Sequence, residues 1–148
     1  QERKSTEGCV QGGGRLAAGG KRTGSTLYQP TVLVDPPDDA DVSRKEVFGP
    51  VVCIYGYDDV DAAITQANAL PYAFQAAVFT DRMSWADYCV EALAASAVMV
   101  NDHTAFRVDW MPFAGRRQSG LGTGGIGYTM ADMSEEKMVV VNSPSSVR

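Results

Sequence analysis

Two side chains suited to holding a ligand stand two residues apart, just before an apolar segment. Glu46 offers a carboxylate and Phe48 an aromatic ring, and Gly49 and Pro50 separate them from the β-type run at residues 51–55. A Gly-Pro pair commonly marks the start of a strand, so both side chains are predicted to lie in the loop at the end of a strand. Open α/β sheets have their ligand-binding and catalytic residues at the ends of strands. From the residues alone, a solvated loop charge is the simpler interpretation of Glu46.

A second group of large and charged side chains occupies residues 103–118, which hold three aromatics and three arginines. Loops this rich in large side chains usually line a pocket. Arg107 is suited to clamping an anionic tail such as a carboxylate or phosphonate. A surface salt bridge to Asp102 or Asp109 is an equally good interpretation of Arg107. His103 has no evident partner, so a hydrogen bond within the loop is expected rather than general-base catalysis.

Composition excludes several classes of protein. The 148 residues are 45% hydrophobic and 21% charged, which is typical of a globular domain rather than a disordered or fibrous chain. Thirteen basic and eighteen acidic side chains give a net charge of −5, and no basic run exceeds two residues, so a nucleic-acid surface is not expected. No apolar run approaches the roughly eighteen residues of a membrane span.

The cysteines and the histidine predict neither a disulfide framework nor a metal site. Cys9, Cys53 and Cys89 are odd in number and widely spaced, and His103 is the single histidine. Cys53 lies in an apolar run and Cys89 on the inward side of a helical pattern, so both are interpreted as small buried hydrophobes. A reducing compartment, the cytoplasm, is therefore the expected location.

A regular alternation of strand and helix patterns begins at residue 51. Strand-like runs cover residues 51–57, 75–80 and 96–101, and helical patterns opened by Asp58 and Asp81 separate them. This order implies parallel pairing with right-handed crossovers. The sequence therefore predicts an α/β fold with an open, mostly parallel βαβαβ sheet.

Shorter elements flank this pattern. Residues 1–14 are typical of the tail of a helix, residues 15–18 of a short strand, and residues 27–34 of β structure. A short helix is expected around residues 128–133. The last apolar run, residues 136–141, is typical of a strand but has no internal partner nearby in the sequence. Such a strand can add to the edge of another chain's sheet.

Several motifs occur together in an order that resembles the C-terminal part of the aldehyde dehydrogenase superfamily. Each motif alone is weak, but their joint order and spacing over residues 12–141 are specific. The closing apolar strand follows them. The segments that carry the resemblance are Pro30-Thr31-Val32-Leu33, Glu46-Val47-Phe48-Gly49-Pro50, residues 68–72, Val78-Phe79-Thr80, Val100-Asn101, Pro112-Phe113-Ala114-Gly115 and Ser119-Gly120-Leu121-Gly122.

The resemblance implies an oxidoreductase that converts an aldehyde to a carboxylic acid with NAD or NADP. In that family a cysteine thiolate forms a thiohemiacetal, hydride passes to the nicotinamide, and water activated by a glutamate releases the acid. Glu46 would bind the ribose hydroxyls next to the nicotinamide, and Phe48 would pack against that ribose and ring. The substrate pocket, for a small aldehyde that is anionic if Arg107 acts as a clamp, would take Phe113, Phe106, Arg107 and His103. For Phe113, anchoring the turn around it is the alternative.

The resemblance also implies which parts of the family's machinery this chain lacks. The nucleophilic cysteine of the family stands in a Gly-Gln-Cys context well before the Glu-x-Phe-Gly-Pro motif, and Cys9 does not match it. The general-base glutamate and the Gly-rich nucleotide-binding segment also precede that motif. We therefore expect a fragment that holds no catalytic residue and does not turn over aldehyde alone. Residues 1–134 would be part of the catalytic domain, and residues 135–148 an oligomerisation strand and tail.

Two further expectations follow from the resemblance. The family's oligomerisation strand augments the sheet of a neighbouring subunit, so a homo-oligomer is expected, and an edge strand within the chain is the alternative. A non-enzymatic interaction module that keeps the sheet and this strand is the second hypothesis for function. A segment before residue 1 that contains the Gly-Gln-Cys context would favour the enzyme over the interaction module. The residues of the expected oligomer contact are Met138, Val139, Val140 and Val141.

Overall fold

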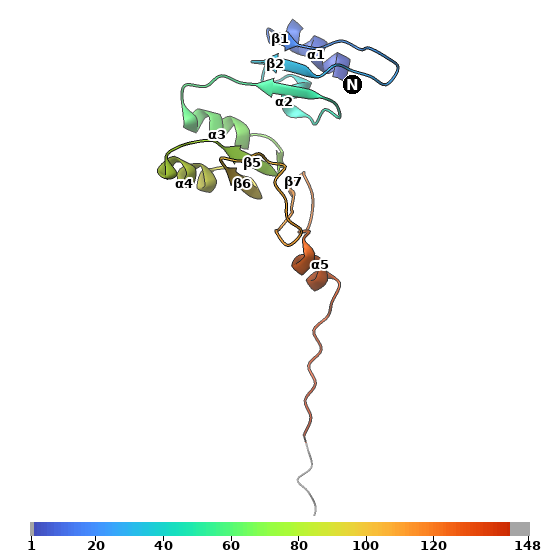
Figure 1. Ribbon diagram of the computed structural model, residues 1–148, viewed down its shortest axis with the longest axis vertical. Coiled ribbons are helices and arrows are strands. Elements are labelled where there is room, and N and C mark those ends of the chain that lie inside the picture. Colours follow the sequence, from blue (N-terminus) through green and yellow to red (C-terminus); the bar gives the residue numbers. More distant parts are fainter. Residues whose placement is uncertain (1, 143–148) are drawn as a thin grey trace, which may run out of the picture. The chain divides into compact units, whose positions relative to one another are not determined.

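The computed structural model describes residues 2–142, in two compact units that meet in the sequence between Ala63 and Ile64 (Figure 1). The first unit holds α1 (Glu2–Gln11), β1 (Arg15–Ala18), β2 (Thr31–Val34), α2 (Asp41–Arg44) and β3 (Val51–Ile54). Helix α3 (Val60–Asn68) runs through the boundary between the units. The second unit holds β4 (Tyr72–Ala73), β5 (Gln75–Val78), α4 (Met83–Ala92), β6 (Ala97–Val100), β7 (Arg116–Arg117) and α5 (Ile126–Asp132).

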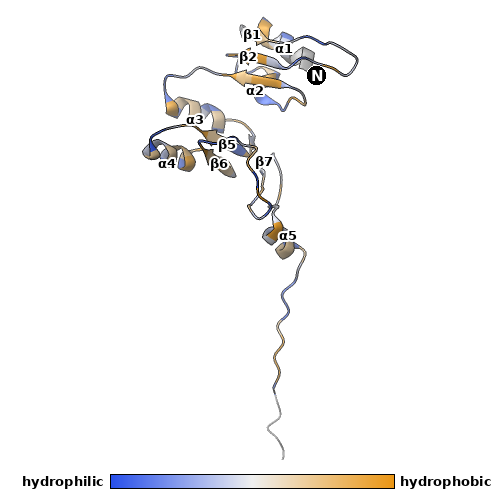
Figure 2. Cartoon of the chain, in the orientation of Figure 1, coloured by the Kyte–Doolittle hydropathy of each residue, from blue (hydrophilic) through white to orange (hydrophobic). Residues whose placement is uncertain are grey.

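The first unit is built on a three-stranded sheet with β2 in the centre. β2 pairs with β3 in parallel, with Leu33 opposite Cys53, and with β1 in antiparallel, with Leu33 opposite Leu16. Side chains alternate along β2, so that Thr31 and Leu33 are buried while the two valines are half-buried. Figure 2 shows β2 and β3 as mainly hydrophobic. The core of this unit therefore lies on one face of β2.

The second unit contains two separate pairs of strands. β5 and β6 pair in parallel with α4 as their connection, and β4 and β7 pair in antiparallel. α4 buries Ala86 and Cys89, and Met99 is buried on β6. The Asn68 side chain ties the end of α3 to the end of α4, because it donates to Ala92 O and accepts from Ala94 N, both at 2.8 Å.

The α/β class and the parallel pairing are confirmed, but the pairing of one strand differs from the expectation. β3 pairs with β2 rather than with β5, so the five alternating elements do not share one sheet. Two backbone bonds at the ends of the pair hold β3 there, from Thr31 N to Pro50 O and from Asp35 N to Ile54 O, each 2.8 Å. Hydrophobic patterning identifies a strand but does not say which edge it joins.

The structure corrects two predicted helix starts. The first turn of α3 is capped by Asp59 rather than Asp58, since Asp59 Oδ1 accepts from Asp61 N at 3.0 Å. α4 begins after Arg82, the N-cap residue, which makes no side-chain cap bond, so the predicted cap Asp81 does not fill that position. In the turn before the helix, Thr80 Oγ1 accepts from Arg82 N at 3.1 Å. Adjacent polar residues compete for such a position, and the path of the chain decides between them.

The predicted terminal strand is not formed in this chain. Within the described part of the sequence, residues 134–142 form neither helix nor strand, and the four apolar side chains expected in the oligomer contact are 72–87% exposed. A strand is stable only when its backbone groups bond to a neighbour, and this segment has no such pairing here. The predicted domain boundary at residue 134 stays a prediction. Among the helices described, none is both long and apolar enough to cross a membrane.

Candidate functional site

The loop that precedes β3 is a tight, hydrogen-bonded turn. It follows α2, where Lys45 Nζ lies 2.8 Å from Asp41 Oδ1. Gly49 N donates to Val47 O at 2.9 Å, and Val51 N donates to Gly49 O at 2.8 Å. These local bonds hold the backbone on both sides of Phe48, so the two candidate side chains project from a defined turn rather than from a long mobile loop.

Glu46 and Phe48 are both exposed on this turn, and Phe48 keeps 76% of its surface accessible. The turn lies at the amino end of β3, beside the amino end of the parallel strand β2. Open α/β sheets bind ligands at the carboxyl ends of their strands. The position of this turn at the amino ends of its strands therefore does not by itself indicate a ligand site. A carboxylate can accept hydrogen bonds from hydroxyl groups and an aromatic ring can pack against a flat apolar group, so both side chains remain candidates for ligand contacts.

A cluster of two rings and one guanidinium forms in the second unit. The rings of Phe74 and Phe113 meet edge to face, with centroids 4.9 Å apart and planes at 88°. The Arg107 guanidinium lies over the Phe113 ring, 4.1 Å from its centroid. Within residues 2–142, no ion pair joins Arg107 to Asp102 or Asp109. The structure therefore gives Arg107 a ring contact and not the surface salt bridge that was the alternative interpretation.

Backbone bonds fix the segment that carries Arg107 and Phe113. Phe113 and Gly124 exchange two bonds, 3.0 Å from Phe113 N and 2.8 Å from Gly124 N. Ile126 N, at the start of α5, donates to Asp109 O at 3.0 Å. Gly125 has φ +119°, and a Cβ there would lie 2.6 Å from Met111 O, so a glycine is required at this close approach. The Gly-rich stretch thus acts as a helix-entry turn that anchors the loop.

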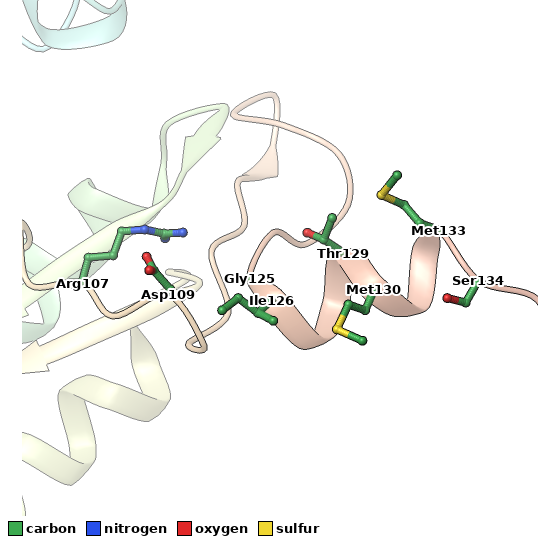
Figure 3. A pocket seen from close by; sticks show the side chains of 8 residues that line it. All are labelled: Arg107, Asp109, Gly125, Ile126, Thr129, Met130, Met133 and Ser134. Atoms are coloured by element: carbon green, nitrogen blue, oxygen red, sulfur yellow. The ribbon is translucent and has the colours of Figure 1, made fainter.

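An open pocket of about 530 Å³ lies between this loop and α5 (Figure 3). Arg107 and Asp109 form its charged side, and the helix supplies a mainly apolar side (Figure 3). Arg107 is the one predicted substrate residue that lines it. The full lining is Arg107, Asp109, Gly125, Ile126, Thr129, Met130, Met133 and Ser134. The pocket offers one cation and one anion beside a hydrophobic wall.

His103 and Phe106 lie on an exposed turn of the same loop and do not line this pocket. His103 Nδ1 accepts from Ala105 N at 3.1 Å, and its Nε2 lies 3.9 Å from Asp102 Oδ1. Phe106 N donates to His103 O at 3.2 Å. The imidazole therefore makes the loop hydrogen bond that the sequence predicts. Of the four predicted pocket residues, only Phe113 and Arg107 are brought into side-chain contact among the interactions described.

The three cysteines are free thiols, and Cys9 and Cys89 are buried. Burial raises the pKa of Cys9, and it also raises the pKa of Cys53, which the nearby Cys9 raises further. Both thiols therefore stay protonated at neutral pH, whereas a nucleophilic cysteine needs a lowered pKa. In the described residues, no group of three His, Cys, Asp or Glu side chains is placed to hold a metal ion.

Sequence reasoning missed the contact of Phe74 and the lining of α5. Phe74 follows the short strand β4, and nothing in the sequence links it to Phe113, because their contact depends on how β4 pairs with β7. The apolar lining supplied by α5 was, however, predictable from the spacing of its residues. Ile126, Met130 and Met133 stand at i, i+4 and i+7, which is the spacing of one helical face.

This chain is similar to known proteins over most of its length. A model described as the aldehyde dehydrogenase family matches residues 1–139. A 3-sulfolactaldehyde dehydrogenase of Priestia aryabhattai is 40% identical over 134 residues, which are 90% of this chain and 28% of that protein. The chain thus spans about 28% of the length of the curated relatives it matches.

Solved structures give the same result. Aldehyde dehydrogenase 21 from Physcomitrella patens, in complex with the reaction product succinate, matches with a TM-score of 0.84 and 36% identity, over 89% of this chain and 27% of that one. Glyceraldehyde-3-phosphate dehydrogenase from Methanocaldococcus jannaschii, complexed with NADP, matches with a TM-score of 0.83 and 35% identity, over 90% and 28%. The local folds of this chain are therefore those of a known group of enzymes.

Proposed function

This chain belongs to the aldehyde dehydrogenase family, and from that membership we propose that it is part of an enzyme that oxidises an aldehyde to a carboxylic acid with NAD or NADP. The observation that carries the proposal is the match of the family model over residues 1–139. The chain contributes one part of the cofactor site and one part of the substrate site. The nucleophilic cysteine, the general base and the main nucleotide cradle belong to other residues of the protein.

Glu46 and Phe48 are proposed to bind the nicotinamide half of the cofactor. The Glu46 carboxylate accepts hydrogen bonds from the paired ribose hydroxyls, and the Phe48 ring packs against the ribose and the nicotinamide. The cofactor, when bound, supplies the hydride acceptor. The exposure of Phe48 supports this role, because a large apolar side chain so open to solvent is suited to covering by a ligand.

Arg107 is proposed to bind an anionic group on the aldehyde, and Phe113 to form part of the wall of the substrate site. Three related proteins are named for or complexed with compounds that carry an acidic group, namely 3-sulfolactaldehyde, glyceraldehyde-3-phosphate and the product succinate, whereas the lactaldehyde of other relatives is uncharged. The guanidinium of Arg107 pairs with none of the predicted acidic partners described here, so its five donors suit a sulfonate, phosphate or carboxylate. His103 and Phe106 complete the loop beside it.

The full-length protein is expected to form NADH or NADPH when it is supplied with an aldehyde, whereas residues 1–148 alone are not. The reason is that burial raises the pKa of Cys9 and of Cys53, and that none of the three cysteines stands in the Gly-Gln-Cys context of the family's nucleophile. Cofactor absorbance measures both. Cofactor reduction by the isolated chain would refute the assignment of its cysteines, and an inactive full-length protein with bound partners would favour the non-enzymatic interaction module.

The Arg107→Gln variant is expected to lose about tenfold in kcat/KM for an anionic aldehyde, since a hydrogen bond to a charged group contributes about 1.5 kcal/mol. The measurement is kcat/KM for succinic semialdehyde against butyraldehyde, which have the same chain length and differ in the carboxylate. Arg82→Gln is the matched control, because Arg82 is also an exposed arginine over a ring, that of Trp85, at 5.6 Å. An equal loss of kcat/KM for both aldehydes would contradict the anion-binding role of Arg107.

The C-terminal run is proposed to join two copies of the protein. Met138, Val139, Val140 and Val141 are exposed and unpaired in the described part of this chain, and their backbone is free to add a strand to the sheet edge of a second subunit. Pairing with a partner would also cover their apolar side chains. The same pairing explains why the segment forms no strand in a single chain.

A further inference from the structure

We propose that the Phe113 ring is a positioning residue for Arg107, holding the guanidinium ready for the anionic group of the aldehyde, and that Phe74 in turn positions the Phe113 ring. The inference rests on the anion-binding role proposed above for Arg107. It adds a specific requirement, namely that selectivity for anionic aldehydes depends on a ring that does not itself touch the anion.

The contact between Arg107 and Phe113 restricts the cation without using its donors. The guanidinium carbon lies 4.1 Å from the ring centroid, well inside the roughly 6 Å range of a cation–π contact. An ion pair with Asp102 or Asp109 would occupy the N–H groups that an anion needs, and none is formed among the described residues. An aromatic ring has no carboxylate oxygen to accept hydrogen bonds, so the N–H groups of the Arg107 guanidinium stay available for an anion.

Rigid backbone supports the two rings, whereas Arg107 is an exposed loop residue. Phe113 exchanges two backbone bonds with Gly124. Phe74 O accepts from Ser96 N at 2.7 Å and from Ser96 Oγ at 2.6 Å, which ties it to the strand pair β5–β6. The edge-to-face contact of the rings then transmits this rigidity to the guanidinium. A side chain that is ordered before its ligand arrives loses less conformational entropy on binding.

The test compares Phe113→Leu and Phe113→Tyr in the full-length enzyme with succinic semialdehyde and butyraldehyde. The measured quantity is the ratio of the two kcat/KM values, which cancels a general loss of activity. Leucine keeps an apolar side chain but removes the ring, so the ratio is expected to fall about threefold to tenfold. Tyrosine keeps the ring, so its ratio is expected to stay within about twofold of the parent value. The loss in Phe113→Leu is expected in KM for the anionic aldehyde rather than in kcat.

The double variant with Arg107→Gln separates positioning from a general structural effect. If the ring acts through Arg107, Phe113→Leu lowers the ratio in the parent enzyme but not in the Arg107→Gln background. Phe74→Leu is expected to lower the ratio by a smaller factor, with the same dependence on Arg107. An unchanged ratio in Phe113→Leu, or an equal loss in both backgrounds, would overturn the proposal while Arg107 still binds the anion. If Arg107→Gln alone leaves the ratio unchanged, the anion-binding role itself fails.

Discussion

The Glu46→Gln enzyme is expected to transfer hydride about a hundredfold more slowly than the parent, with a much smaller change in KM for the aldehyde. A carboxylate that accepts from two ribose hydroxyls makes two charge-assisted hydrogen bonds, worth about 3 kcal/mol together. Glutamine has the same shape but no charge, so it weakens the hold on the ribose without opening a cavity. The effect falls on kcat because orientation for transfer, rather than binding of aldehyde, depends on this contact.

Single-turnover formation of NADH or NADPH measures this step directly. Glu91→Gln provides the matched control, since Glu91 is an exposed glutamate on α4 outside the proposed site, and its rate should equal that of the parent. A parent-like transfer rate in Glu46→Gln would remove Glu46 from the cofactor site. A raised KM for the aldehyde with a normal rate of hydride transfer would instead assign Glu46 to the substrate site.

The Leu33→Ala variant is expected to lose about 2–5 kcal/mol of stability, the usual cost of removing a fully buried leucine side chain. Leu33 is 0% exposed and sits at the centre of the three-stranded sheet, opposite Leu16 on one neighbour and Cys53 on the other. Its truncation leaves a cavity that the strands cannot close without losing their register. Urea unfolding of the protein measures the change.

Leu121→Ala is the control for this substitution, because Leu121 is 100% exposed in the described chain. The same chemical change there is expected to alter the free energy of unfolding by no more than about 0.5 kcal/mol. A loss below about 1 kcal/mol in Leu33→Ala would show that the β2 face is not the core of this unit. A loss at Leu121 as large as at Leu33 would show that another part of the protein covers it.

The proposed activity uses both compact units of the chain. Glu46 and Phe48 belong to the first unit, and Arg107, Phe113 and Phe74 to the second. Each group is held by backbone bonds within its own unit, the turn before β3 in one case and the bonds of Phe113 and Phe74 in the other. Substitutions of Glu46 or Phe48 are therefore expected to affect cofactor handling, and substitutions in the second group to affect substrate choice.

Much of the local structure was predictable from the sequence, because it depends on short-range rules. Alternating or continuous apolar runs identified β3, β5 and β6, and helical spacing identified α3 and α4. The resemblance in motif order also led to the family. Helix starts were less predictable, since Asp58 and Asp59 are equally suited to capping α3 and only the chain path decides between them.

The sequence by itself determined the class of fold, the elements β3, β5, β6, α3 and α4, and the family, because those follow from residue types at fixed spacing. Only the tertiary structure decided that β3 joins β2, that Arg107 rests on Phe113 rather than an acidic partner, and that residues 134–142 form no strand in a single chain. The physical reason is common to all three. A strand edge and a charged side chain each have several chemically acceptable partners, and which one they meet depends on distant segments of the chain.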